Sequence, residues 1–156
     1  MPSYYLLFNM IYLTSDHGGY QLKKFLGGYL KNTLKTPFKD LGPQERIATD
    51  DFPDYAIPAA KKVMENTNNR GIFICWTGQG MCITANKIKG IRAILGYSID
   101  SAEWGRLHNN ANVLCLAGKV LSEDHAAVIV KKFLETKFDG DERLTRRDKK
   151  IAELEK

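Results

Sequence analysis

Short apolar runs alternate with stretches of helical periodicity five times along the chain, and this alternation constrains the fold more than any other feature. Between the runs, apolar residues recur at three- and four-residue spacing, which indicates helices with one buried face. Five runs have the length of buried strands: 11–13, 38–41, 71–76, 91–95 and 113–116. Strands that alternate with helices form parallel sheets covered on both faces. We therefore predict an α/β fold, a single-domain three-layer α/β/α sandwich around a five-stranded parallel Rossmann-like sheet.

Some of the predicted helices carry signals at their ends. Asp54 is the expected N-cap of a helix that ends near residue 66, and Pro58 fits that helix only in its first turn. Ser122, followed by two acidic residues, is the expected cap of another helix. Further helices are predicted over 22–32, up to 87, over 98–108 and over 143–155. Residues 1–9 are expected to be either an extension before the first element or the result of a misplaced start.

Composition and charge argue against two kinds of binding partner, nucleic acids and membranes. Lys and Arg number 23 against 18 Asp and Glu, but the positive residues are scattered, and acidic residues dilute their densest run at 143–150. Because no nucleic-acid-binding motif accompanies that run, we expect no nucleic-acid partner. The apolar run near the start of the chain is too short to span a bilayer, so we expect no membrane partner.

The three cysteines form no C-x-x-C pair, which argues against a disulfide framework and against a structural zinc site. A reducing cytoplasm fits this cysteine usage best, and we predict no bound metal.

Residues that could carry chemistry follow the predicted strands, and ligands of parallel sheets bind beyond the carboxyl ends of the strands. Cys75 ends a buried strand just before a helix, whose dipole favours a thiolate; an inert core cysteine is the alternative. Gly78 and Gly80 permit a tight turn that brings backbone N–H groups to an anion. The turn lacks the P-loop pattern, and no arginine follows Cys75 as it would in a cysteine phosphatase.

Two histidines and two arginines complete the candidates. His17 and His108 are predicted to open onto the same end of the sheet and to converge on the loop of Cys75. Arg143 and Arg147 are four residues apart, so they share one face of the C-terminal helix. Asp16 is expected to orient an imidazole or a sugar hydroxyl, although an aspartate that only forms a turn has the same sequence pattern.

Several motifs occur together in one order: SDHGGY at 15–20, FPDYA at 52–56, ICWTGQGM at 74–81, ANK at 85–87, GIRA at 90–93 and HNNANVL at 108–114, followed by the arginine pair. This set resembles the ribose-5-phosphate isomerases of type B, of the ribose/galactose isomerase family. The resemblance covers nearly everything from Met10 to Lys156.

The resemblance implies an aldose–ketose isomerase that interconverts ribose 5-phosphate and ribulose 5-phosphate through an enediolate, without cofactor or metal. Cys75 matches the base of the family, Thr77 a proton relay, and His108 the group that opens the furanose ring. The residues that match contacts to the substrate or to the enediolate oxygen are Asp16, His17, Trp76, Gly78, Gln79, Gly80, Asn109, Lys119, Arg143 and Arg147. In the family the site lies between subunits, which implies a homodimer or a tetramer.

Three residues depart from the family pattern. Trp76 replaces a glycine, Phe52 replaces a tyrosine, and Lys119 replaces an arginine and so loses a bidentate donor. Two alternatives therefore stay open: the same reaction on a six-carbon aldose phosphate, or a phosphosugar-binding protein without catalysis. The pair Arg143 and Arg147 favours a pentose phosphate, because the related galactose-6-phosphate isomerases lack it.

Overall fold

The computed structural model describes residues 8–156, and its centre is one parallel sheet with the strand order β2-β1-β3-β5-β4. The strands are β1 (Ile11–Ser15), β2 (Phe38–Asp40), β3 (Arg70–Cys75), β4 (Ala93–Leu95) and β5 (Val113–Ala117). All four pairings are parallel. The predicted α/β fold with its five-stranded parallel sheet is confirmed.

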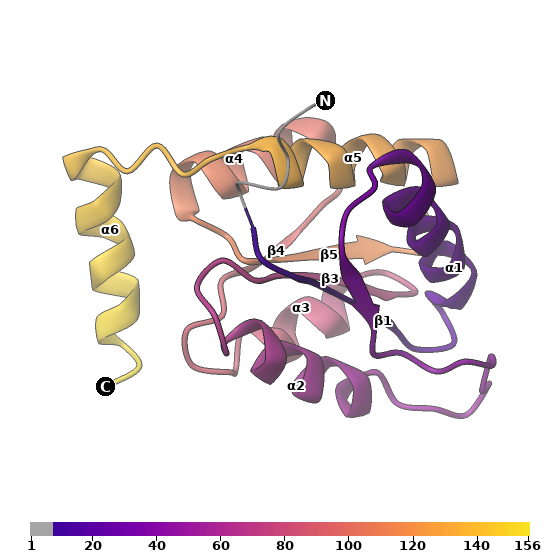
Figure 1. Ribbon diagram of the computed structural model, residues 1–156. Helices are drawn as coiled ribbons and strands as arrows, with labels where there is room; N and C mark the ends of the chain where they lie inside the picture. The colour runs from indigo at the N-terminus through magenta and orange to yellow at the C-terminus, as the bar shows by residue number, and fades with distance from the viewer. Residues whose placement is uncertain (1–7) are drawn as a thin grey trace.

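Helices cover both faces of this sheet (Figure 1). One face carries α1 (Tyr20–Gly28), α4 (Ile99–Asn109) and α5 (Glu123–Glu135), and the other carries α2 (Phe52–Val63) and α3 (Gln79–Ala85). Helix α1 continues into a π-helical turn over Tyr29–Thr33, which the sequence pattern does not predict. None of the helices in residues 8–156 is both long and apolar enough to cross a bilayer.

Strand β3 lies in the middle of the sheet, and all six of its residues are buried. Ile72 and Ile74 pack into the core beneath α1, α4 and α5, whereas Phe73 and Cys75 pack into the core beneath α2 and α3. This alternation follows from the two-residue period of a strand. It places the side chain of Cys75 on the α2–α3 side, at the carboxyl end of the strand.

The N-terminus of α2 differs from the prediction. Asp51 rather than Asp54 is its N-cap, and Pro58 lies in the helix interior rather than in the first turn. Pro58 interrupts the helical hydrogen bonds there, yet it lies on the exposed face, while Ala56 and Ala60 on the other face are fully buried. The packing of that small-residue face against the sheet therefore outweighs the tendency of the proline to break the helix. The helix ends at Val63, three residues before the predicted end.

The other predicted elements agree with the structure to within one or two residues at their ends, and Ser122 caps α5 as predicted. The predicted extension 1–9 lies mostly outside the described residues. Its last two residues belong to the folded body: Phe8 is buried, and the N–H of Asn9 donates to the carbonyl of Asn68 at 2.8 Å.

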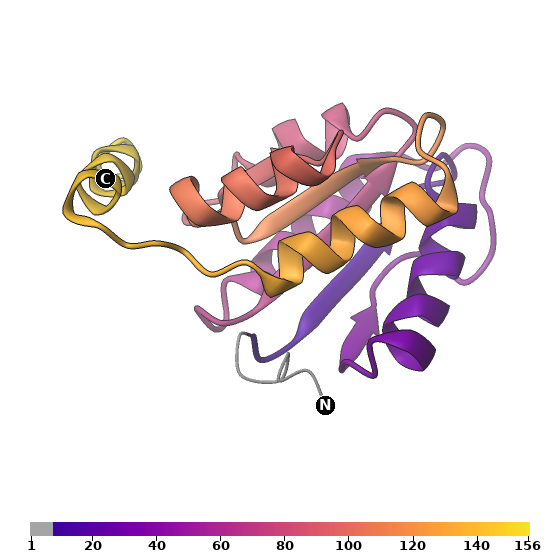
Figure 2. The same ribbon diagram turned by 90° about the horizontal axis from the view of Figure 1, so that it is seen from above.

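The last helix, α6 (Glu142–Glu153), stands apart from the rest of the molecule at the end of an extended linker (Figures 1 and 2). Two polar contacts hold it: Arg92 pairs with Asp148 at 3.3 Å, and the N–H of Gly90 donates to Glu155 at 2.9 Å. Leu144 is its one buried residue. The helix is thus fixed in place while much of its surface stays uncovered.

Candidate active site

Three loops meet at the carboxyl edge of the sheet, after β1, β3 and β5. A Cβ atom on Gly18 would lie 2.8 Å from the backbone nitrogen of Trp76, and a Cβ atom on Gly118 would lie 2.7 Å from the carbonyl oxygen of Gly18. Only glycine permits such close approach. The strand-end loops singled out in the sequence therefore contact one another, as the parallel topology predicts.

Hydrogen bonds within the turn after β3, and one from the loop after β5, fix the conformation of that turn. Cys75 is only 4% exposed, and its carbonyl accepts from the N–H of Gly118 at 2.9 Å. Gly78 has a φ of 76° and is the N-cap of α3, a conformation that favours glycine. The hydroxyl of Thr77 accepts from the N–H of Gln79 at 3.3 Å. The thiol therefore lies beside a turn of fixed backbone geometry.

Phe52 packs directly against this turn. A Cβ atom on Gly80 would lie 2.7 Å from the Phe52 ring, so the glycine leaves room for that ring. The residue that replaces the family tyrosine thus lies at the first turn of α3, where it supplies apolar surface but no hydroxyl.

Asp16 folds the loop after β1 onto itself. Its Oδ1 accepts from the N–H groups of Gly18 at 2.9 Å and Gly19 at 3.3 Å. Burial raises the pKa of the Asp16 carboxyl, and the two backbone donors partly offset that rise. The turn-forming role foreseen as an alternative is therefore present, and any contact to a sugar remains a prediction.

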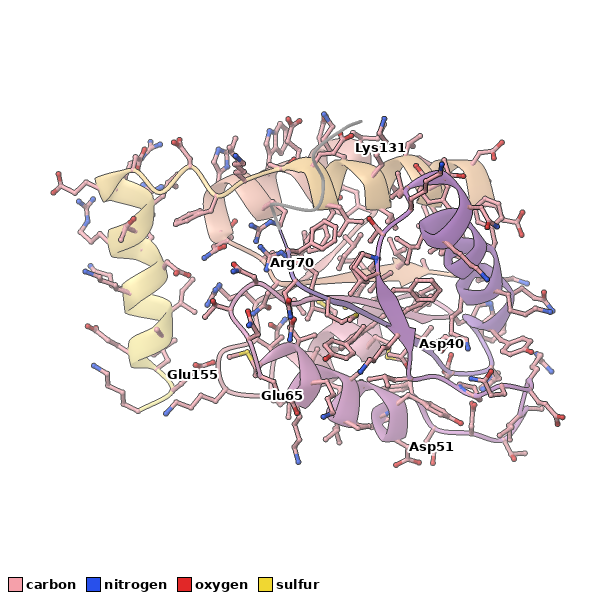
Figure 3. The ribbon with its side chains drawn as sticks, in the orientation of Figure 1. Asp40, Asp51, Glu65, Arg70, Lys131 and Glu155 are labelled. Carbon is pink, nitrogen blue, oxygen red and sulfur yellow. The ribbon has the colours of Figure 1, made fainter. Side chains whose placement is uncertain are left out.

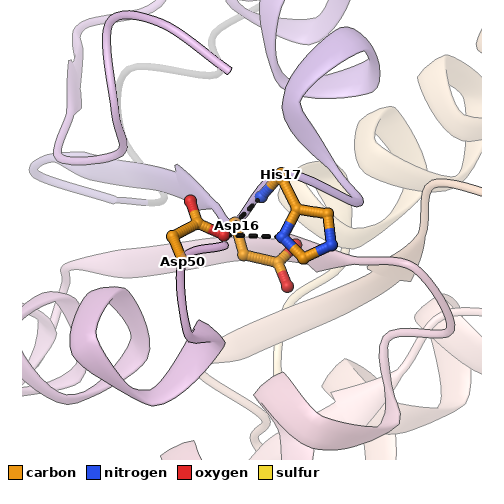
Figure 4. A group of neighbouring side chains, drawn as sticks. All are labelled: Asp16, His17 and Asp50. Atoms are coloured by element: carbon orange, nitrogen blue, oxygen red, sulfur yellow. Dashed lines mark hydrogen bonds and ion pairs between the residues drawn. The ribbon is translucent and has the colours of Figure 1, made fainter. Parts of the chain in front are cut away.

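His17 is held by Asp50, a residue that the sequence analysis did not single out (Figure 4). One carboxylate oxygen, Oδ1 of Asp50, lies 2.7 Å from Nδ1 of His17 and accepts from the His17 N–H at 3.0 Å. The Nδ1 atom therefore carries the proton in this pair, and Nε2 is left to bind a ligand. Among the described residues, Asp16, His17 and Asp50 bring metal-binding atoms within 4.8 Å of one another. Asp16 already accepts from backbone groups of its own loop, and His17 and Asp50 already bond to each other.

A cavity of about 360 Å³, here called the carboxyl-edge pocket, lies between these loops, and two positively charged side chains line it. Its polar and aromatic lining includes His17, Arg46, Trp76 and Lys119. The Lys119 ammonium lies 5.4 Å from the centroid of the Trp76 ring, a cation–π contact. Arg46 comes from the loop between β2 and α2, and its role was missed because it lies in a polar segment without periodicity. The pocket suits an anionic ligand.

The remaining predicted residues gather in a second cavity of about 330 Å³, here called the α6 pocket. It is lined by His108, Asn109, Arg143, Leu144 and Arg147. The predicted sharing of one helix face by the two arginines is therefore confirmed. Both guanidinium groups are exposed, and Arg143 lies 3.6 Å from Asp141.

The prediction that His17 and His108 open onto the same end of the sheet is wrong. His108 lies near the C-terminus of α4, and the chain after it leads directly into the start of β5. A helix that connects parallel strands runs antiparallel to them, so its C-terminus returns to the amino edge. The carboxyl-edge pocket and the α6 pocket therefore lie at opposite edges of one chain.

Comparison with known proteins shows which family this chain belongs to. The family profile described as Ribose/Galactose Isomerase matches residues 11–151. The chain belongs to the ribose/galactose isomerase family. The resemblance inferred from its motifs is thereby confirmed.

Individual members of the ribose/galactose isomerase family match nearly the full chain. A probable ribose-5-phosphate isomerase B of Mycoplasma genitalium is 44% identical over 147 residues, 94% of this chain and 95% of that protein. The ribose-5-phosphate isomerase B of Mycobacterium tuberculosis is 35% identical over 94% of this chain and 90% of that one. A crystal structure of the Mycoplasma genitalium isomerase with bound ribulose-5-phosphate has a TM-score of 0.89 and 43% identity, with coverage of 94% and 95%.

Proposed function

We propose that this chain interconverts ribose 5-phosphate and ribulose 5-phosphate in the cytoplasm, as an enzyme of pentose phosphate metabolism. The observation that carries the proposal is a cationic pocket lined by Trp76, the residue that follows the buried Cys75, in a chain 43% identical to an isomerase with bound ribulose-5-phosphate. His17, Arg46 and Lys119 present nitrogen donors to that pocket, which a phosphate group requires.

In this proposal Cys75 is the base. Its thiolate takes the proton from C2 of the open-chain aldose, the C1–C2 double bond forms, and negative charge develops on O1. The same thiol returns the proton to C1 while the O2 proton moves to O1, with Thr77 as its relay. Backbone N–H groups of Trp76, Gly78 and Gly80 would stabilise the enediolate oxygen. The turn supports this role because Gly78, with a φ of 76°, fixes the backbone conformation at the start of α3.

A second copy of the chain would complete the site. His108 is proposed to open the furanose ring, with Asn109 beside it, and Arg143 and Arg147 to bind the phosphate together with Lys119. The α6 pocket holds all of these groups except Lys119, at the opposite edge of the chain, and an extended linker sets α6 apart from the body (Figures 1 and 2). A homodimer, or a tetramer of such pairs, would place the α6 pocket of one chain against the carboxyl-edge pocket of the other.

Isomerisation of ribose 5-phosphate in the presence of EDTA tests the proposal, with Cys75→Ala as the decisive variant. We expect loss of turnover with the fold intact, because an alanine leaves only a small cavity but removes the proton carrier. Cys82→Ala is the matched control, since Cys82 lies in α3 with its Sγ 3.4 Å from the carbonyl of Ala93. Near-normal turnover of Cys75→Ala would remove the base from the mechanism, and an inactive wild-type chain would contradict the proposed reaction.

A further inference from the structure

The loop between β2 and α2 (residues 41–50), here called the β2–α2 loop, carries Arg46 to the carboxyl-edge pocket. Figure 3 labels Asp40 and Asp51, the residues on either side of this loop. Residues 44–49 are all exposed, so the burial of apolar side chains contributes little to their placement. Polar contacts are therefore what can hold Arg46 at the pocket.

A buried lysine of α1 holds the start of the β2–α2 loop. The Lys23 side chain is only 2% exposed, and its ammonium lies 2.6 Å from Oδ2 of Asp40 and donates to the carbonyl of Pro43 at 2.8 Å. The other carboxylate oxygen of Asp40, Oδ1, accepts from the N–H of Gly42 at 2.8 Å. One ammonium and one carboxylate thus fix the direction of the chain as it leaves β2.

Two further contacts fix the β2–α2 loop on both sides of Arg46. Before it, Tyr20 of α1 donates from its hydroxyl to the carbonyl of Gln44 at 2.9 Å. After it, the carboxylate of Asp50 bonds to His17, which itself lines the carboxyl-edge pocket. Arg46 therefore lies between two anchors, one on α1 and one on the loop after β1.

Stability alone does not account for a charge at the position of Lys23. Removing an ammonium from water costs free energy that an ion pair repays only in part, and an apolar side chain of the same length would fill the same space. The ammonium instead supplies directed donors to two acceptors at the end of β2. What the charge adds over an apolar side chain is the orientation of the β2–α2 loop.

The carboxyl-edge pocket has a use for the guanidinium that this loop brings to it. No carboxylate is among the described residues that line the pocket, and its second cation, Lys119, stands where the family pattern has an arginine. Lysine keeps the charge but lacks the planar fork that binds two phosphate oxygens together. Arg46 restores such a fork to the same cavity.

We propose that Arg46 binds the phosphate group of the substrate and that Lys23 is a positioning residue, which acts by holding Arg46 at the carboxyl-edge pocket. The inference rests on the proposed isomerase function and adds two residues to it. Lys23 does not line the pocket, so its contribution passes through the β2–α2 loop.

Calorimetric titration with ribulose 5-phosphate tests the role of Arg46, in a Cys75→Ala background in which the proposed reaction cannot occur. Arg46→Ala should weaken binding about tenfold or more, as for the loss of a charged hydrogen bond. Arg46→Lys should recover part of the affinity, because the charge is kept and only the fork is lost. Lys39→Ala is the matched control: it removes a positive charge from an exposed residue of β2 outside the pocket, and it should leave binding unchanged.

A double-mutant cycle in the same background tests the positioning role. Lys23→Met should weaken binding several-fold when Arg46 is present and should have little further effect in Arg46→Ala, because the two residues act as one unit. A merely structural role would lower Tm in both chains and leave the affinity of the folded protein unchanged. Lys31→Met, exposed in the turn that follows α1, is the matched control. If Lys23→Met fails to fold by circular dichroism, Asp40→Asn replaces it in the cycle, because it removes the charge of the pair but keeps an acceptor for Gly42.

Two results would overturn the proposal. Equal affinities of the Arg46→Ala and Lys39→Ala chains would remove the phosphate contact, and an equal effect of Lys23→Met with and without Arg46 would remove the positioning role. Failure of the proposed function gives a different result. A wild-type chain that does not isomerise ribose 5-phosphate, yet binds ribulose 5-phosphate through Arg46, would contradict the reaction and support the inference.

Discussion

The proposed division of the site between two chains predicts what happens when two variants that are each nearly inactive at low substrate concentration are mixed and assayed at that concentration. Cys75→Ala removes the base beside the carboxyl-edge pocket, and Arg147→Ala removes a cation from the α6 pocket at the opposite edge. In a mixed dimer, one site then carries both defects and the other carries neither. Random reassociation of equal amounts makes about half of all dimers mixed, and half of the sites in these are intact. The mixture should therefore recover about one quarter of the wild-type activity.

The assay refolds the two variants together and measures isomerisation of ribose 5-phosphate, with mixed dimers verified by a mass tag on one chain. The control pair is Cys75→Ala with Thr77→Ala. Both residues lie on the same turn, so every site of that mixed dimer is defective and activity should stay absent. Recovery in the control pair would refute the reasoning. So would an inactive test pair in which mixed dimers are present, because each site would then be built from one chain.

Four variants and one control test individual side chains. Arg147→Ala should raise KM for ribose 5-phosphate by about one to two orders of magnitude, as for loss of a charged hydrogen bond of about 1.5–3 kcal/mol. Arg146→Ala, outside the α6 pocket, should leave KM unchanged, and equal KM values in the two variants would place the phosphate elsewhere. Asp50→Asn should lower kcat/KM about tenfold, because the charge that orients the neighbouring imidazole is lost; wild-type kinetics would remove this positioning role. Asp16→Asn should keep or raise Tm at pH 7, because burial raises the pKa of Asp16 and so makes its charged form costly above that pKa. This gain should vanish below the ordinary value of 3.8, and a lower Tm at pH 7 would contradict the argument. Trp76→Gly should increase kcat/KM for a six-carbon aldose phosphate relative to ribose 5-phosphate, and an unchanged ratio would show that the indole does not shape the site.

The sheet and the loops at its carboxyl edge are predictable because their signals are local. Central parallel strands are continuous apolar runs, and the loops that follow them must meet at one edge. Asp50 and Arg46 are not predictable in this way. They lie in a polar loop without periodicity, and the bond from Asp50 to His17 joins residues 33 positions apart. Only the folded chain shows that the loop between β2 and α2 returns to the site.

His108 shows a different limit of sequence reasoning. A motif marks a residue as part of a site, but it does not say at which edge of the sheet that residue lies. Topology decides this, because residues after a strand reach the carboxyl edge and residues that end a connecting helix reach the amino edge. The proposed reaction uses both His108 and Cys75, and for this reason the proposal includes a second chain.

Trp76 and Lys119 depart from the family pattern at positions that contact each other, which suggests that the two changes act together. The indole is 56% exposed, so it lies at the rim of the carboxyl-edge pocket rather than over the buried Cys75. Lys119 rests against its ring at 5.4 Å, where the attraction is worth about 0.5–1 kcal/mol at an exposed site. A lysine held this way loses the fork of an arginine but keeps three donors, and its stem is restrained by the ring. The indole thus forms one wall of the pocket and fixes the cation beside it, while Arg46 supplies a guanidinium to the same cavity.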